Sequence, residues 1–122
     1  MNRILLRTRY ETVEIELDES DTSNAIYLAL PLTKEVSTWG GEVYFEIPVE
    51  MPLHDGKKVM EVGEVAYWPE GKAFCIFFGR TPFSKGTAPE AYSMVTPIGR
   101  VVSNLQAIEE MLDRTEVTLD TH

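Results

Sequence analysis

Two arginines that directly follow glycines are well suited by type and position to bind a ligand. They occur in Gly79-Arg80 and Gly99-Arg100, and each pair ends or interrupts an apolar run. Glycine allows a close approach of the backbone, and the guanidinium group is a planar, permanently charged donor for a carboxylate or carbonyl oxygen. The alternative is that both arginines are exposed and balance an acidic surface.

Two aromatic segments beside glycine or proline can likewise be interpreted either as part of a binding site or as part of the core. In Trp39-Gly40-Gly41 and Tyr67-Trp68-Pro69, an indole ring can line a ligand cleft, because its face is apolar and its N–H needs a partner. The same rings can equally close one end of the core. Together with the arginines they predict a surface cleft for a small molecule or peptide. The predicted ligand-binding residues are Trp39, Tyr44, Tyr67, Trp68, Phe77, Phe78, Arg80, Thr96 and Arg100.

The sequence lacks the residues that several other kinds of functional site require. Ala66 occupies the position where a phosphate-binding loop ending at Gly71-Lys72 would need its first glycine. No Gly-x-Ser-x-Gly elbow of a serine hydrolase occurs. The two histidines, His54 and His122, are a turn residue and the terminal residue, so we expect no metal site and no cofactor.

The carboxylates and the single cysteine favour structural roles. Glu42 and Glu46 alternate with apolar residues, which places both on a predicted solvent face rather than in an acid–base pair. Cys75 lies within an apolar run, where burial raises a thiol pKa and makes the thiol inert. We therefore expect Cys75 to fill the core.

The composition is that of one soluble domain. The chain has 122 residues, 43% of them hydrophobic, and no stretch approaches the ~20 apolar residues of a membrane span. The net charge of −9 and the scattered basic residues argue against nucleic-acid binding. An N-terminus without an apolar leader and a single cysteine predict a cytoplasmic protein without an internal disulfide.

The hydrophobic pattern predicts short strands and two helices. Alternation indicates half-buried strands, and the apolar run 73–78 indicates a strand within the core. Asp21 is expected to cap a helix that Pro31 ends, and Ser103 with Gln106 fits the capping box of a second helix. The predicted strands lie near Ile4–Leu6 and at 11–17, 42–47, 65–68, 73–78, 95–102 and 117–119, with extended chain around Asp55-Gly56.

About eight strands in 122 residues predict a single mainly β domain, residues 1–122, folded as a closed eight-stranded barrel with two short helices. Closure removes the exposed edges of a sheet. The predicted helices do not alternate with parallel strands, which disfavours a doubly wound α/β fold.

Three segments together resemble a prokaryotic cyclophilin-like family of unknown function, typified by a small Thermotoga protein. They are STWGGEVYFEIPV (37–49), EVGEVAYWPEGKAFCIFFGRTP (61–82) and VTPIGRVV (95–102). The resemblance covers nearly the whole chain, and it implies the cyclophilin fold, a closed barrel with two helices.

The resemblance leaves the activity open. Peptidyl-prolyl isomerases of the cyclophilin type carry a Phe-His-Arg strand motif and a Gln-Gly-Gly-Asp segment, and neither is present here. The first expectation is therefore a ligand-binding domain without that catalytic motif. The alternatives are a divergent prolyl isomerase that uses Arg80 or Arg100, and a homodimeric interaction module.

Overall fold

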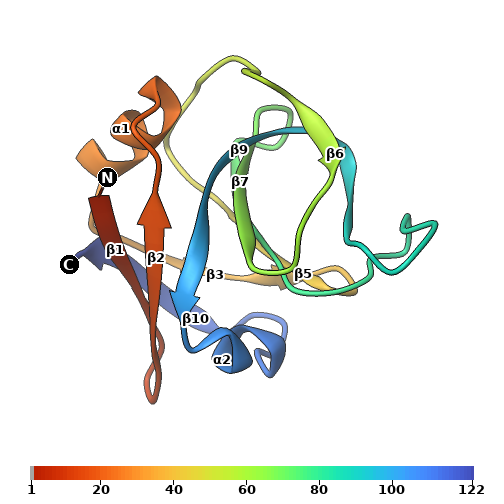
Figure 1. The fold of residues 1–122 in the computed structure, drawn as a ribbon. Helices are drawn as coiled ribbons and strands as arrows, with labels where there is room; N and C mark the ends of the chain where they lie inside the picture. The colour runs from red at the N-terminus through yellow and green to blue at the C-terminus, as the bar shows by residue number, and fades with distance from the viewer. Residues whose placement is uncertain (1) are drawn as a thin grey trace.

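The computed structural model describes residues 2–122, which form ten strands and two helices (Figure 1). The elements are β1 (Asn2–Arg7), β2 (Thr12–Leu17), α1 (Asp21–Leu28), β3 (Leu32–Glu35), β4 (Ser37–Thr38), β5 (Glu42–Glu46), β6 (Lys57–Val59), β7 (Glu64–Trp68), β8 (Ala73–Phe77), β9 (Glu90–Ser103), α2 (Leu105–Glu109) and β10 (Glu116–Thr121). Neither helix in this range is long and apolar enough to cross a membrane.

The strands form one antiparallel sheet in the order β3-β10-β1-β2-β9-β7-β8-β5-β4, and β6 pairs with β9 outside this path. The mainly β fold with two helices is thus confirmed. The expected closed eight-stranded barrel is not supported, because the sheet has ten strands and no ladder joins its end strands β3 and β4.

The two end strands of the sheet, β3 and β4, follow each other in the chain and are separated only by Val36. Its N–H donates to the Thr115 carbonyl at 2.9 Å, and its carbonyl accepts from the Arg114 N–H at 2.8 Å. The N–H of Thr38 donates to the Asp113 carboxylate at 2.9 Å. Because the turn at 113–115 uses these backbone groups, they are not available to pair β3 with β4 or β5.

The main core lies on the inner face of the curved sheet. It is formed by alternate residues of the strands, among them Ile4, Leu6, Ile15, Phe74 and Leu119, each with no exposed surface. The period of two in β1, β2 and β10 places their apolar side chains on this face and their charged side chains in solvent. The predictions of half-buried strands at the chain ends are confirmed.

A second buried cluster lies on the outer face of the sheet, opposite the main core. From β7 it contains Ala66, and from β8 the alternate residues Ala73, Cys75 and Phe77. The other members are Met60 from the segment before β7, and Ala91 and Val95 of β9. β6 and the first half of β9 pair with each other over this region, and β9 continues from there toward α2 (Figure 1). All five residues of β8 are therefore buried, which explains the unbroken apolar run that the sequence shows there.

The two helices begin differently from the sequence prediction. Ser20, not Asp21, caps α1: its hydroxyl accepts a hydrogen bond from the Ser23 N–H at 3.2 Å. At α2 the N-cap is Asn104, in the left-handed conformation, and no side chain caps the helix. Ser103 cannot form the expected capping box, because it still belongs to β9 and pairs with Glu14.

We expect Ser20→Ala to lower the free energy of unfolding by about 1 kcal/mol, the typical cost of losing a helix N-cap. Ser103→Ala is the matched control and should change it by less than about 0.5 kcal/mol, since Ser103 is an exposed residue without a capping bond. Urea unfolding of the three proteins measures both values. Equal effects of the two substitutions would contradict this assignment of the caps.

Candidate functional site

A cavity of about 230 Å³ opens beside the second cluster, between the outer face of the sheet and the first half of β9. Four of its seven lining residues are aromatic. The lining consists of Trp39, Glu42, Tyr44, Trp68, Ala91, Tyr92 and Val95. Both tryptophans of the chain are among them. At neutral pH, the only side chain of this set that can carry a full charge is that of Glu42.

A tight hairpin brings Trp39 and Glu42 together. The two residues exchange backbone hydrogen bonds of 2.9 and 3.2 Å across the turn formed by Gly40 and Gly41. Gly40 has a φ of +57°, a conformation that glycine adopts without strain. The Gly41 carbonyl accepts from the Phe78 N–H at 2.7 Å, so the hairpin is fixed against the end of β8.

The aromatic side chains contact one another at steep angles. The ring centroids of Tyr44 and Trp68 are 6.5 Å apart, at an interplanar angle of 89°. Tyr92 lies 5.9 Å from Trp68 at 66°, and 6.0 Å from Trp39 at 69°. Such edge-to-face contacts are favoured by the charge distribution of the rings, and they turn the four rings in different directions around the cavity.

Hydrogen bonds and a further ring hold these walls. The indole N–H of Trp68 donates to the Ser93 hydroxyl at 2.7 Å, which fixes the ring against β9. Phe83 stacks on Tyr92 with ring centroids 5.2 Å apart, and it forms a T-shaped pair with Trp39 at a centroid distance of 5.1 Å. The rim of the cavity is thus supported by the loop between β8 and β9.

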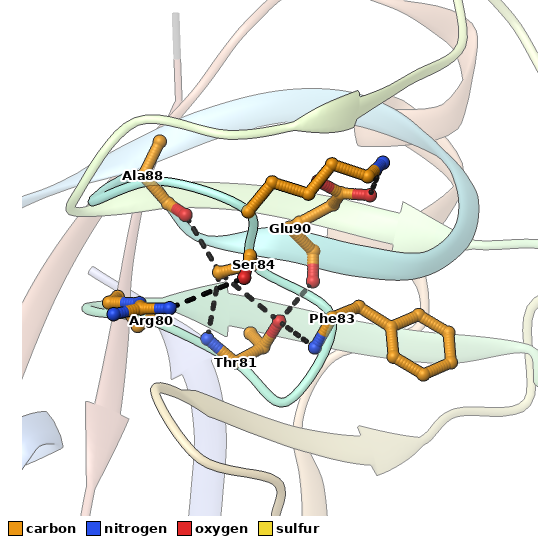
Figure 2. A network of polar contacts seen from close by, with 7 residues as sticks. Arg80, Thr81, Phe83, Ser84, Ala88 and Glu90 are labelled. Carbon is orange, nitrogen blue, oxygen red and sulfur yellow. Dashed lines mark hydrogen bonds and ion pairs between the residues drawn. The ribbon is translucent and has the colours of Figure 1, made fainter.

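That loop is stabilised by two hydroxyl groups. Figure 2 shows hydrogen bonds converging on Thr81 and Ser84, with the Phe83 ring pointing away from them. Thr81 donates to the Glu90 carbonyl at 2.5 Å and accepts from the Phe83 N–H at 3.2 Å. Ser84 donates to the Ala88 carbonyl at 2.8 Å. These bonds place Phe83 where it can support Tyr92.

Glu42 has the most unusual environment of the cavity. Only 6% of its surface is exposed, so its prediction as a solvent-face residue is wrong. The outer face of β5 is covered here by the aromatic residues of β9 and of the hairpin. Burial raises the pKa of Glu42 to about 7, and a hydrogen bond with the Cys75 thiol opposes the rise.

The other two buried glutamates differ from Glu42 in having cationic partners. Glu64 pairs with Lys57 at 3.0 Å, and Glu90 pairs with Lys85 at 3.3 Å. Within residues 2–122, no ion pair to Glu42 is formed. Glu42 is therefore a buried carboxyl group beside a cavity and without a counter-ion among these residues.

Cys75 has the environment expected from the sequence. Its side chain is fully buried in the second cluster. Burial raises the pKa of its thiol well above the usual value, and the neighbouring carboxylate of Glu42 raises it further. Among the described residues, no group of three or more His, Cys, Asp or Glu could hold a metal ion.

Three of the nine residues expected to bind a ligand line the cavity: Trp39, Tyr44 and Trp68. Two others have polar partners in the interior. Tyr67 is fully buried, and its hydroxyl donates to the Val49 carbonyl at 2.6 Å. Thr96 is also buried and accepts a hydrogen bond from the His54 N–H at 3.0 Å.

The remaining four residues of that set lie outside the lining as well. Phe77 is buried within the second cluster, and Phe78 packs against the main core. Arg80 is exposed and donates to the Ser84 carbonyl at 3.4 Å, while Arg100 pairs with Glu61 at 3.2 Å. Neither arginine lines the cavity. Ligand binding by any of the nine stays a prediction.

Sequence reasoning missed four lining residues, which are Glu42, Ala91, Tyr92 and Val95. A signal existed for Glu42, because a two-residue Gly-Gly turn places the residues on either side of it, here Trp39 and Glu42, opposite each other. No comparable signal existed for Tyr92. It lies near the start of β9, three residues before the strand 95–102 that the sequence pattern predicts.

Comparisons with known proteins agree with this architecture. The family described as cyclophilin-like matches residues 2–120. The solution structure of a hypothetical protein from Archaeoglobus fulgidus is similar, with a TM-score of 0.84 and 36% sequence identity over 99% of this chain and 95% of that one. No curated protein matches the chain. The resemblance noted in the sequence is thereby confirmed, and the chain belongs to the cyclophilin-like family.

Proposed function

We propose that this cyclophilin-like domain binds a small molecule, or a side chain of a peptide, in the aromatic cavity. The observation that carries the proposal is the wall of four aromatic residues beside the buried carboxyl group of Glu42. Ligand sites are typically concave and mostly apolar, with a few polar groups that fix orientation. The cavity is smaller than the ~300–1,000 Å³ of drug-sized sites, so it suits a compact ligand or the head of a larger one.

The proposal keeps Trp39, Tyr44 and Trp68 from the predicted set and adds Glu42 and Tyr92. It does not use Arg80 or Arg100, because neither lines the cavity. A prolyl isomerase would need a hydrogen-bond donor beside the twisted amide, and neither Arg80 nor Arg100, the arginines predicted for that role, lines the cavity. Isomerase activity and homodimer formation therefore stay predictions without a supporting contact.

The test is native mass spectrometry of the protein isolated from its own host, followed by a screen of common metabolites by tryptophan fluorescence. Both tryptophans line the cavity, so a bound ligand should change their emission. Tyr92→Ala removes one wall and should weaken binding of any hit at least tenfold, a loss on the scale of one aromatic contact.

Tyr10→Ala is the matched control, because Tyr10 is also exposed but lies in the β1–β2 turn. It should leave binding unchanged. If no compound is retained and none alters the fluorescence, or if both tyrosine variants bind equally well, the proposal fails.

A further inference from the structure

The aromatic cavity has the charge pattern of a site for cations. Its walls are the rings of Trp39, Tyr44, Trp68 and Tyr92, and its one ionisable carboxyl group is that of Glu42. The faces of aromatic rings are electron-rich and attract cations, most strongly where water is excluded. A carboxylate beside them adds a full negative charge.

Glu42 differs from the other buried carboxyl groups in a way that itself points to a missing cation. Glu64 and Glu90 are buried to a similar degree, and each has a lysine partner. A buried charge is costly unless it is paired, so carboxylates in such places normally have a counter-ion. Residues 2–122 provide none for Glu42. Glu42 itself lines the cavity.

The arrangement of the rings fits an organic ammonium group better than a metal ion. The three ring pairs meet at 66–89°, so they present walls on several sides of one space. A methylated ammonium group is roughly spherical, carries its charge on an apolar surface, and contacts several rings at once. Metal ions instead need several oxygen, nitrogen or sulfur ligands, and Glu42 is the only carboxylate of the lining.

We propose that the cavity binds an organic ammonium cation, with Trp39, Tyr44, Trp68 and Tyr92 around the cationic group and Glu42 as its counter-ion. The proposal rests on the function proposed above and names the class of ligand. The cation can belong to a free small molecule or to a methylated lysine of a peptide, since both present the same group.

Ionisation of Glu42 makes binding depend on pH. Its carboxyl group must lose its proton to act as the counter-ion, and burial holds its pKa at about 7. The other ionisable groups around it are the Cys75 thiol of β8, the Tyr44 phenol of its own strand and the Tyr92 phenol of β9. A cation without a titratable group should therefore bind more tightly at pH 8 than at pH 5.5.

The test compares three ligands of nearly equal shape by tryptophan fluorescence. Choline is the cation, 3,3-dimethylbutan-1-ol is its neutral carbon analogue, and 3,3-dimethylbutanoate is an anion. We expect choline to bind at least about tenfold more tightly than the other two at pH 8, and about tenfold more weakly at pH 5.5 than at pH 8. A peptide containing trimethyl-lysine, compared with its unmodified form, distinguishes the two sources of the group.

Glu42→Gln keeps the shape of the side chain and removes its charge. It should weaken choline binding about tenfold or more and abolish the pH dependence, while leaving the neutral analogue unaffected. Glu46→Gln is the matched control, because Glu46 is the exposed outward residue four positions further along β5. It should bind choline like the wild type.

The outcomes separate this inference from the function on which it rests. Equal binding of choline and the neutral alcohol, or preferred binding of the anion, would overturn the ammonium proposal and leave a ligand-binding cavity. Failure of all three ligands and both peptides to bind would overturn the ammonium proposal directly. The metabolite screen would then decide separately whether the cavity binds another ligand.

Discussion

Replacing Glu42 by glutamine is expected to stabilise the protein at pH 8 by roughly 3 kcal/mol and to change its stability at pH 4 by less than about 1 kcal/mol. The reason is the buried position of the carboxyl group, whose pKa rises from 4.5 to about 7 on folding. Between these two values the folded protein binds more protons than the unfolded chain. The free energy of unfolding of the wild type should therefore fall as the pH rises through this window, and the neutral amide removes that loss.

Urea unfolding at pH 4, 6 and 8 measures this effect. Glu46→Gln removes the same charge from an exposed position of β5 and should change the stability by less than about 0.5 kcal/mol at each pH. If the difference in stability between the wild type and Glu42→Gln were the same at pH 8 and at pH 4, Glu42 would not be desolvated as described.

A gain in stability from this substitution would have a functional meaning. A buried carboxyl group without a counter-ion lowers stability, and such costs are commonly retained at binding sites. An added cation that occupies the cavity should then recover part of the lost stability of the wild type at pH 8. The same cation should not stabilise Glu42→Gln to that extent, which links the stability measurement to the binding measurement.

Gly41→Ala is expected to destabilise the protein by about 3 kcal/mol and to disturb the cavity from its rim. A Cβ atom at this position would lie 2.2 Å from both the carbonyl carbon and the carbonyl oxygen of Gly79. Backbone atoms cannot rotate away as a side chain can, so the hairpin or the end of β8 would have to move. Trp39 and Glu42 would move with the hairpin.

Gly86→Ala is the control for this substitution. Gly86 lies in the neighbouring exposed loop, and apart from Gly86 and its two chain neighbours no residue has a heavy atom within 4 Å of a Cβ built there. Its replacement should leave stability within about 0.5 kcal/mol of the wild type or raise it slightly, because alanine restricts the unfolded chain. Thermal unfolding and the tryptophan emission maximum report the two effects. A Gly41→Ala protein that unfolds like the wild type would show that the close approach to Gly79 is not required.

Local patterns in the sequence determined much of the sheet. Alternation predicted β1, β2, β5 and β10 because a half-buried strand turns every second residue toward the core. The unbroken apolar run predicted β8, a strand covered on both faces. By contrast, β3 and β4 were missed, since they are short, partly exposed end strands with little periodicity.

The sequence also selected three of the aromatic residues that line the cavity, because tryptophan and tyrosine beside turns are typical of ligand sites. Only the tertiary structure decided which of the other ligand-type residues share that space. It placed Arg80 and Arg100 on exposed loops and strands away from the cavity lining, and it brought Tyr92 to Trp39 from a segment without any pattern.

Glu42 shows the physical limit most clearly. A period of two tells which face of a strand a residue occupies, and it placed Glu42 opposite the main core. It cannot tell what covers that face, because the cover comes from β9, some fifty residues later in the chain, and from a hairpin set by the contact of Gly41 with Gly79. The sequence alone determined most of the longer strands and the side that their residues occupy, and long-range packing decided which outward residues line the cavity.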